Sequence, residues 1–250
     1  MSTRKVAIVT GSTSGIGLVT AQRLAQDGFN VIVTGRSVTR GEDAVSRIGA
    51  RASFIPSDLS VRGAPANLVE RALASLGRLD VLVNNAAIDH TSELLDVTED
   101  EIRDTLEINT VAPMGMLIAA ARTMRSQGEG GSIINITSRL ATVGVPTMGV
   151  YSASKGAMLA FTKASAIDLA PFNIRVNAVA PGMTRTPLYE SWIATMDNPE
   201  EAAHKVASQI PLGRIAEPED VAAVVAFLAS PEAGYLTGAS IPVEGGYLAK

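Results

Sequence analysis

The chain contains no cysteine, so it forms no disulfide bonds and carries no mark of an oxidising compartment. Its only two histidines, His90 and His204, lie far apart in the sequence without ligand-like neighbours, so we predict no metal site. Basic residues form no cluster, and 21 lysines and arginines stand against 25 aspartates and glutamates. This distribution argues against nucleic acid as a partner.

Long hydrophobic runs are absent as well. The longest, Val221 to Ala229, has nine residues, whereas a membrane-spanning helix needs roughly 20. The run from Val6 to Val9 is too short for the hydrophobic region of a secretion signal. We therefore expect no membrane partner and a cytoplasmic location.

The chain is rich in hydrophobic residues, at 46% of 250, which suits one α/β domain without linkers or repeats. Short β-branched runs alternate with helical patterns, and several runs are apolar throughout, as parallel strands buried on both faces are. This alternation predicts a doubly wound, mostly parallel sheet of the Rossmann type. Strands are expected at 5–10, 30–35, 52–56, 79–84, 131–137, 173–179 and 239–243, and helices at 15–27, 63–76, 98–126, 151–170 and 217–230.

Tyr151 and Lys155 form the most informative pair in the chain. They are four residues apart, which on a helix places both side chains on one face, one turn apart. A phenol has a reference pKa of about 10, and a neighbouring ammonium group is expected to lower that pKa by favouring the phenolate. With Ser138 thirteen positions before the tyrosine, the pattern indicates a site that passes a proton to or from an oxygen atom.

A glycine-rich loop, residues 11–17, lies between the first expected strand and the first expected helix. A strand, a glycine turn and a helix in this order make a phosphate cradle, because the backbone can approach a diphosphate closely and the helix N-terminus favours its negative charge. The residues expected to contact the phosphates or their nucleotide are Gly11, Ser12, Ser14, Gly15, Ile16 and Gly17.

Taken together, the motifs resemble those of the short-chain dehydrogenase/reductase family. The glycine loop, Asn84-Asn85-Ala86, Ser138, the Tyr151–Lys155 pair and Pro181-Gly182 stand in the family's order, and the match runs from about residue 5 to the C-terminus. The similar branch has chains of this length and includes 3-oxoacyl-[acyl-carrier-protein] reductases. One departure is Ala87, at a place where the family usually has glycine.

The resemblance implies a catalytic set, a cofactor site and a strand order. Ser138, Tyr151 and Lys155 would be catalytic, and Asn109 would complete the set by anchoring a water in a proton relay. Seven strands would run in the order 3-2-1-4-5-6-7. Besides the glycine loop, the residues that would contact a nicotinamide dinucleotide are Asp58, Leu59, Asn85, Ala86, Tyr151, Lys155, Pro181, Gly182, Thr184 and Thr186. Asp58 also fits a helix N-cap, and both interpretations stay open.

The end of the second expected strand, Gly35-Arg36-Ser37, bears on which dinucleotide binds. An NAD site places a carboxylate there, about 20 residues past the glycines, to bind the ribose 2′-hydroxyl. This turn has none, whereas Arg36 offers a planar, permanently charged group for a 2′-phosphate. Ser12 and Ser37 can add hydroxyl donors. We predict a preference for NADP(H), with use of NAD(H) left open.

The expected reaction is hydride transfer between the nicotinamide and a small-molecule ketone or secondary alcohol. Ser138 would orient the carbonyl oxygen and Tyr151 would supply the proton. A 3-oxoacyl thioester is the substrate that the resemblance favours, with an NAD(H)-dependent dehydrogenase of cyclic or steroidal alcohols as the alternative. A non-catalytic NADP-binding sensor is a further alternative, but a sensor has no need of the four catalytic residues.

Residues 183–209 resemble the family's substrate lid. Its apolar members, Tyr189, Trp192, Ile193 and Met196, are each typical of helix packing but as a group suggest an apolar pocket. Two other residues are notable: Arg139, directly after the catalytic serine, and His90, in the loop after Ala87. We expect both side chains to be exposed to solvent. The alternative for Arg139 is a contact with a carboxylate, and the alternative for His90 is a place at the mouth of the substrate pocket.

The assembly expected from the family is a homotetramer. Residues 157–167 and 221–229 carry small and apolar side chains around most of a helix, more than the single stripe that a surface helix of a monomer needs. Excess apolar surface of this kind favours subunit contacts.

Overall fold

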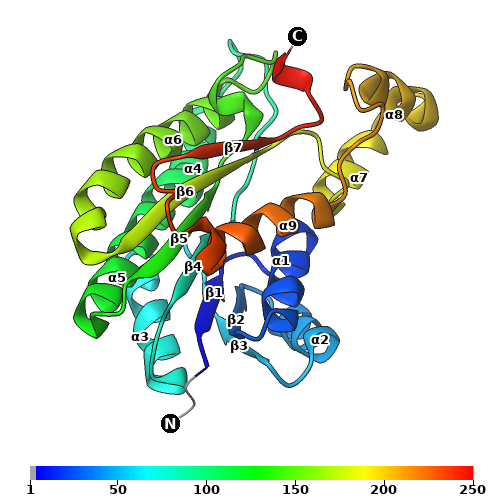
Figure 1. The fold of residues 1–250 in the computed structure, drawn as a ribbon. Coiled ribbons are helices and arrows are strands. Elements are labelled where there is room, and N and C mark those ends of the chain that lie inside the picture. The colour runs from blue at the N-terminus through cyan, green and yellow to red at the C-terminus, as the bar shows by residue number, and fades with distance from the viewer. Residues whose placement is uncertain (1–3, 250) are drawn as a thin grey trace.

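The computed structural model describes residues 4–249, which form a seven-stranded sheet with helices on both faces (Figure 1). All neighbouring strands are parallel, and their order is β3-β2-β1-β4-β5-β6-β7, which confirms the predicted fold class and order. The strands are β1 (Val6–Val9), β2 (Asn30–Gly35), β3 (Ala52–Pro56), β4 (Val81–Asn84), β5 (Gly131–Ile136), β6 (Ile174–Pro181) and β7 (Ser240–Val243).

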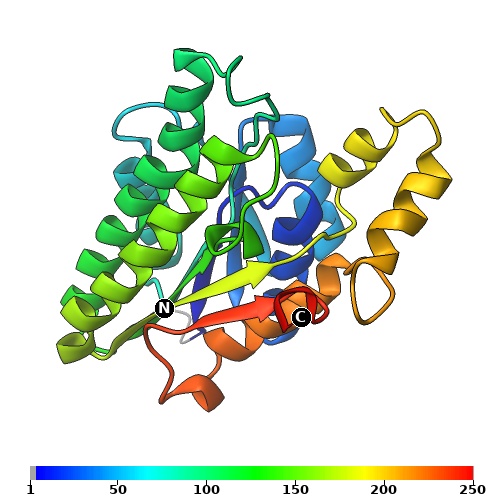
Figure 2. The same ribbon diagram turned by 90° about the horizontal axis from the view of Figure 1, so that it is seen from above.

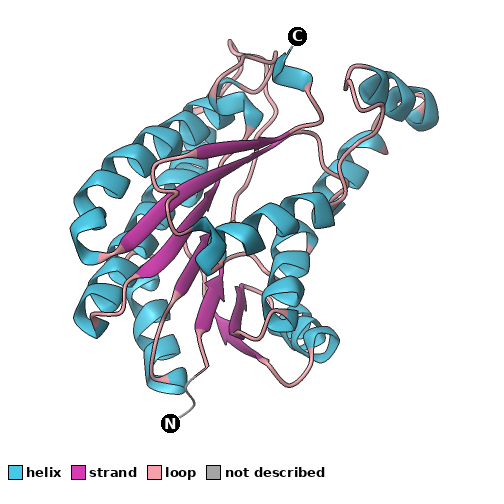
Figure 3. Ribbon diagram, viewed as in Figure 1, coloured by secondary structure: helices cyan, strands magenta, loops and turns pink. Residues whose placement is uncertain are grey.

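Two groups of helices cover the two faces of the sheet (Figure 3). One face is covered by α1 (Gly15–Gln26), α2 (Val38–Ile48) and α9 (Pro218–Ala229), and the other by α3 (Ala64–Leu76), α5 (Ala112–Gln127) and α6 (Gly149–Leu169). Two short helices, α7 (Pro187–Ile193) and α8 (Pro199–Ser208), project from the body beside the end of β6 (Figure 1).

The core explains why the strands are apolar throughout. Successive side chains of a strand point to opposite faces, and in β1 Val9 packs in the cluster beneath α1 and α9, whereas Ile8 packs in the cluster beneath α3 and α5. Both are fully buried. A strand covered by helices on both faces has no side for polar residues, so alternation gives way to a continuous hydrophobic run.

The expected long helix at 98–126 is correct in extent but not in form. It comprises α4 (Glu99–Leu106), a π-helical turn (Glu107–Val111) and α5, so the backbone carries a local bulge in its middle. Such bulges are rare and occur frequently at functional sites. The short lid helices α7 and α8 were not among the predicted helices, because neither is long enough to display a clear 3.6-residue hydrophobic period.

The topology brings the predicted motifs to one edge of the sheet, because neighbouring strands point the same way, as β6 (yellow) and β7 (red) do in Figure 2. Gly11 follows β1, Asn84 ends β4, Ser138 follows β5 and Pro181 ends β6. The carboxyl ends of parallel strands form the crevice in which open α/β sheets bind ligands. Among residues 4–249 there is no helix with the length and hydropathy of a membrane span.

Candidate active site

Ser138, Tyr151 and Lys155 meet where β5 ends and α6 begins. The Lys155 Nζ lies 5.5 Å from the centroid of the Tyr151 ring, as the four-residue spacing predicted. The Ser138 side chain lowers the pKa of Tyr151, and it accepts a hydrogen bond from the backbone N–H of Leu140 (3.1 Å). The serine is thereby fixed at the start of a 3₁₀ turn (Arg139–Ala141), with its hydroxyl beside the phenol.

Lys155 is buried, with 3% of its surface exposed. Its ammonium group donates a hydrogen bond to the Ile136 carbonyl oxygen at the end of β5 (3.0 Å). Burial disfavours the charged form and lowers the pKa of Lys155 from 10.5 to about 8, and the negative charge of Asp89 partly opposes this effect. The amine therefore titrates near neutrality, where an ordinary lysine stays charged.

The acidity of Tyr151 differs from the sequence prediction. Burial raises the pKa of Tyr151 from 10.0 to about 12, the charge of Asp89 raises it further, and only the bond from Ser138 lowers it. Lys155, which was expected to lower the pKa of Tyr151, is not among the groups that shift it. Tyr151 is partly buried, and a phenolate withdrawn from solvent lacks part of the solvation that stabilises it, so the predicted direction was wrong for the protein by itself.

Asp89 is the charged residue of this site that the sequence motifs did not reveal. It lies in the loop after β4, partly buried, and burial raises the pKa of its carboxyl group, while the charges of His90 and Lys155 lower it. No family motif covers it, and no local spacing relates it to Tyr151. Only the folded loop places this carboxylate within electrostatic range of the tyrosine and the lysine.

Asn109 lies in the π-helical turn and is buried. Its Nδ2 donates to the Ile88 carbonyl oxygen (2.7 Å) and to the Ser154 hydroxyl (3.2 Å), and its Oδ1 accepts from the Ile88 N–H (2.9 Å). Both amide hydrogens are thus used, which leaves one lone pair on Oδ1 for the expected water. The side chain connects the loop after β4 to α6, and thereby places Asp89.

The glycine loop is packed so closely that positions 11 and 17 have no room for, or no backbone conformation suited to, a larger residue. A Cβ atom on Gly17 would lie 2.5 Å from both the Asn85 Nδ2 and the Gly11 carbonyl oxygen, and Gly11 itself has φ of +64°. Asn85 donates from Nδ2 to the Thr10 carbonyl oxygen (2.9 Å), so its amide braces the loop. Ser14 begins α1 without a side-chain cap, which leaves the helix N-terminus open to an anion. This cradle fits a diphosphate.

Other members of the predicted cofactor set make contacts within the protein. Ser12 is fully buried, and its hydroxyl donates to the Val9 carbonyl oxygen (2.6 Å) and accepts from the Thr34 N–H (3.0 Å). The hydroxyl thus joins β1 to β2 and its hydrogen is already donated, so cofactor binding by Ser12 stays a prediction. Leu59 is buried in the cluster beneath α3 and α5, whereas Ile16 packs against the cluster beneath α1 and α9. Ala86 bonds through its N–H to the Thr10 hydroxyl (3.0 Å).

Arg36 lies exposed at the end of β2, next to the end of β3. Its charge reaches Asp58, where bonds from the Ser60 hydroxyl and N–H (2.7 and 3.0 Å) lower the pKa of the carboxyl group. Asp58 thus makes the local bonds expected of a turn. The Ser37 hydroxyl caps α2 by accepting from the Arg40 N–H (3.4 Å).

The segment after β6 crosses the glycine loop. A Cβ atom on Gly15 would lie 3.5 Å from the Thr186 side chain, so the first residue before α7 stands over the phosphate cradle. Thr184 is buried and donates to the Gly182 carbonyl oxygen (3.2 Å). A Cβ atom on Gly182 would meet Glu244 at 2.8 Å, so the turn after Pro181 packs directly on the C-terminal segment.

The lid helices form a small core of their own. Tyr189 and Ile193 are buried there with Ile210 and Ile215, and Trp192 and Met196 pack against them. The rings of Tyr189 and Trp192 are 6.0 Å apart between centroids. Each of these residues therefore packs between helices, as is typical of such side chains. The prediction that they jointly line an apolar pocket gains no support.

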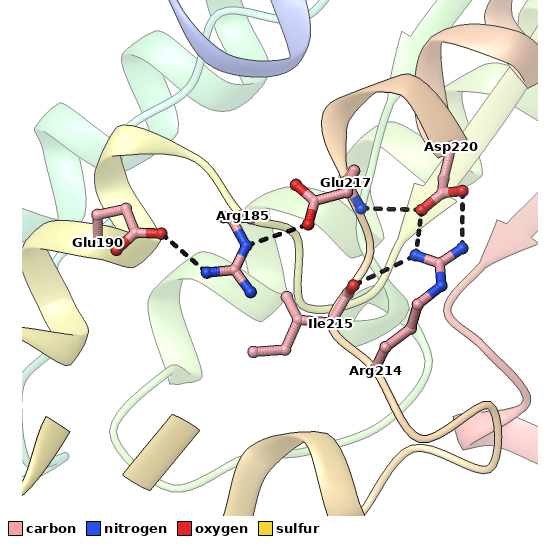
Figure 4. Close-up of polar contacts among 6 residues, drawn as sticks. All are labelled: Arg185, Glu190, Arg214, Ile215, Glu217 and Asp220. Carbon is pink, nitrogen blue, oxygen red and sulfur yellow. Dashed lines mark hydrogen bonds and ion pairs between the residues drawn. The ribbon is translucent and has the colours of Figure 1, made fainter. Parts of the chain in front are cut away.

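Ion pairs hold both ends of the lid to the N-terminus of α9, as Figure 4 shows. At one end Arg185 pairs with Glu217 (3.1 Å) and Glu190 (3.4 Å). At the other end Arg214 pairs with Asp220 (2.6 Å), which also accepts from the Glu217 N–H (2.8 Å). These pairs are solvent-exposed, so their net contribution is small, but they align the two chain segments that enter and leave the lid.

The solvent expectation was wrong for both Arg139 and His90. Arg139 is half-buried, and its guanidinium carbon lies 4.0 Å from the centroid of the Tyr247 ring, a stacking contact across the C-terminal segment. His90 is also half-buried, and its Nε2 is enclosed without a hydrogen-bond partner among the described residues. Both residues lie beside the catalytic set.

Comparison with known proteins agrees with this geometry. A family model described as "Enoyl-(Acyl carrier protein) reductase" matches residues 11–248. An uncharacterized oxidoreductase of Methylorubrum extorquens is 42% identical over 97% of each chain, and the NADP-dependent (R)-specific alcohol dehydrogenase of Lentilactobacillus kefiri is 37% identical over 98% of this chain and 97% of that one. A solved short chain dehydrogenase/reductase family protein has a TM-score of 0.88 at 37% identity, covering 99% of this chain and 100% of the other.

Proposed function

The chain belongs to the short-chain dehydrogenase/reductase family of oxidoreductases, and on that premise we propose that it interconverts a ketone and a secondary alcohol with NADP(H). The observation that carries the proposal is the meeting of Ser138, Tyr151 and buried Lys155 at the edge of the sheet that holds the glycine cradle. A sensor that only binds a dinucleotide would not need a buried lysine beside a phenol and a serine hydroxyl.

The dinucleotide would be held along the strand ends. The open N-terminus of α1 and the glycine loop suit the diphosphate, and Thr186 stands over the same loop. Lys155 would bind the ribose next to the nicotinamide. When bound, the reduced nicotinamide supplies a hydride to the carbonyl carbon.

Side chains of the protein orient the substrate's carbonyl oxygen and supply the proton that it receives. Ser138 donates a hydrogen bond to the carbonyl oxygen, which orients the substrate, and Tyr151 donates a proton to the alkoxide that develops there. A pKa of about 12 keeps Tyr151 protonated near neutrality, so it is loaded as the acid that carbonyl reduction requires. Alcohol oxidation needs the phenolate instead, so it is favoured as the pH rises. Lys155 would pass protons onward to a water held by the free lone pair of Asn109 Oδ1.

The preference for NADP(H) rests on Arg36. Its exposed guanidinium stands at the end of β2, where a 2′-phosphate would lie, and the turn contains no acidic residue. The nearby Asp58 already has its Oδ1 engaged by the hydroxyl and the N–H of Ser60. One relative of similar length is named as an NADP-dependent alcohol dehydrogenase, which supports the same choice.

The substrate proposed on the family description is a 3-oxoacyl thioester, with a cyclic or steroidal ketone as the second candidate. The test is turnover of a panel containing acetoacetyl thioester, cyclic ketones and simple acyclic ketones, followed by the absorbance of NADPH and, separately, of NADH at equal concentration. Reduction of at least one ketone with NADPH preferred is expected. No turnover on any member, with dinucleotide binding intact, would favour the sensor.

A tetramer is the proposed assembly. Ile167 on α6 (76% exposed) and Val111 and Ile118, which precede and lie on α5, remain uncovered on one side of the protein. The second surface expected, residues 221–229, is different: Val221, Val225 and Leu228 are buried, because α9 packs on α1 and the sheet of its own chain. Light scattering of the purified protein measures the assembly, and a monomer at micromolar concentration contradicts the proposal.

A further inference from the structure

Arg139 occupies an unusual position for a cation. It directly follows Ser138, opens the 3₁₀ turn (Arg139–Ala141) after β5 and lays its guanidinium over the ring of Tyr247 at 4.0 Å. Tyr247 in turn packs against the core of the lid. The guanidinium therefore stands at the junction of the catalytic serine, the C-terminal segment and the lid, which is where the part of a substrate beyond its carbonyl group would lie.

The charge of Arg139 has no direct partner. Within residues 4–249, no carboxylate lies at ion-pairing distance from its guanidinium and no acceptor receives a hydrogen bond from it. Burial lowers its pKa, which shows that the group has lost part of its hydration. A half-buried cation without hydrogen-bond acceptors is costly, so the residue is one for which a partner from outside the chain is expected.

Neighbouring groups oppose the effect of burial only in part, since the charges of Tyr247 and Glu244 raise the pKa of Arg139 but burial is the larger effect. Glu244 is the carboxylate whose charge reaches Arg139, but its Oε2 accepts from the Leu248 N–H (2.9 Å) in its own turn. Tyr247 covers one face of the guanidinium plane. Stacking of this kind leaves the N–H groups along the edge of the plane free to donate, because they point outward within the plane.

We propose that Arg139 is a specificity-determining residue that binds a carboxylate on the substrate, so that the preferred ketones are oxo acids. The inference rests on the proposed function, because it concerns the same site. A carboxylate matches the guanidinium edge by two parallel N–H···O bonds, a geometry that a point cation does not offer. Because Arg139 is adjacent to Ser138, the carboxylate must lie only a few bonds from the carbonyl group that Ser138 orients.

The binding step requires no chemistry beyond the proposed hydride transfer. With its carboxylate on Arg139 and its carbonyl oxygen on Ser138, an oxo acid is held at two points, which fixes the face of the carbonyl group presented to the nicotinamide. The same two contacts would hold the hydroxy acid formed. The inference therefore favours an oxo acid over the 3-oxoacyl thioester as the preferred ketone, and it also implies a single stereochemical outcome.

The test compares acids with their neutral esters. Reduction of acetoacetate and levulinate by NADPH is measured beside reduction of their methyl esters, which keep the carbon skeleton and remove the charge. For one of the two pairs we expect kcat/KM to favour the acid by about 10- to 100-fold, the factor for a hydrogen bond to a charged group. The substitution Arg139→Gln should abolish that preference through KM, and Arg139→Lys should restore part of it.

Arg125→Gln is the matched control, because Arg125 also stacks on an aromatic ring, that of Phe172 (5.2 Å), but at the far end of α5. It should leave the acid preference unchanged. Esters reduced as well as acids by the unsubstituted enzyme, or an equal loss on both in Arg139→Gln, would overturn the inference and leave the proposed function standing. If neither acid nor ester is reduced, the proposed function fails, and the shift in melting temperature of the NADPH complex with acid against ester still decides the role of Arg139.

Discussion

The side-chain amide of Asn109 holds the backbone of Ile88 through two hydrogen bonds, with Nδ2 donating to the carbonyl oxygen (2.7 Å) and Oδ1 accepting from the N–H (2.9 Å). The asparagine lies in the π-helical turn between α4 and α5, and Ile88 lies in the loop after β4. This contact determines where the next residue, Asp89, stands. Because the charge of Asp89 raises the pKa values of Tyr151 and Lys155, the π-helical turn influences both pKa values through this contact.

Asp89→Asn should shift the pH dependence of alcohol oxidation to lower pH. The charge of Asp89 raises the pKa of Tyr151, so its removal favours the phenolate that oxidation requires. The pKa of Lys155 should fall too, because the same charge raises it. The measurement is kcat/KM for oxidation across pH, with Asp96→Asn, an exposed change in the same loop, as the control. An unshifted or upward-shifted profile would contradict the assignment.

Tyr151→Phe should remove most turnover while leaving NADPH binding nearly intact. The substitution deletes only the hydroxyl, and a general acid contributes about 10²–10⁴-fold to rate. Steady-state kinetics gives the loss, and fluorescence titration with NADPH gives the binding. Near-normal reduction by the phenylalanine variant would show that another group supplies the proton.

Lys155→Met should abolish activity but raise the melting temperature at neutral pH. Burial lowers the pKa of Lys155 from 10.5 to about 8, so the charged lysine destabilises the folded state by about 3 kcal/mol below pH 8. Loss of the bond to Ile136 offsets about 1 kcal/mol of the gain. A net rise of about 5 °C is expected by calorimetry.

The pH dependence of that difference provides an internal check. Between about pH 8 and 10.5 the unfolded lysine holds more protons than the folded one, so the unsubstituted protein gains stability as the pH rises and the methionine variant loses its advantage. Lys163→Met, an exposed substitution on the same helix, should show no such trend. A constant or widening difference across this pH range would argue against a buried, desolvated ammonium group.

Arg36→Leu should weaken NADPH without affecting NADH. The 2′-phosphate would lose its charged partner, which corresponds to about a 10- to 100-fold rise in KM for NADPH, whereas the NADH ribose carries no phosphate to lose. Arg47→Leu, an equal change of charge on the exposed side of α2, is the matched control. Equal effects on the two dinucleotides would reject Arg36 as the selectivity residue.

Gly17→Ala should lower both thermal stability and dinucleotide affinity. A helix interior normally gains up to about 1 kcal/mol from such a change, but here the new methyl group would meet the Gly11 carbonyl oxygen and the Asn85 amide at 2.5 Å. Gly156→Ala in α6 is the control, because its Cβ would meet nothing closer than 3.8 Å. If the Gly17 variant were as stable as the Gly156 variant, the glycine loop would be able to move away from the new methyl group without a large loss of stability.

Most of the fold follows from local patterns. Apolar runs such as Val81-Leu82-Val83 predicted buried parallel strands, and the strand ends were placed within about two residues. The proximity of Tyr151 and Lys155 also followed from sequence, because a four-residue spacing on a helix has one geometric outcome. Alanine at position 87, where the family usually has glycine, causes no backbone strain, because Ala87 does not adopt a positive φ.

Other features depended on contacts between distant segments. Nothing near Ser12 in the sequence shows that its hydroxyl joins two strands, and nothing near Arg139 shows that it stacks on Tyr247. The apolar helix from Val221 to Ala229 was interpreted as a subunit surface, because sequence alone does not reveal that α1 and the sheet cover it.

By itself, the sequence predicted which residues take part in the chemistry, and it determined on which edge of the sheet they gather, because periodicity, glycine spacing and strand order are properties of short segments. Only the tertiary structure decided their electrostatic state. Burial of Tyr151 and Lys155, and the approach of Asp89 from another loop, set the direction of both pKa shifts. Desolvation and charge proximity act through space, and they are established only once the chain has folded.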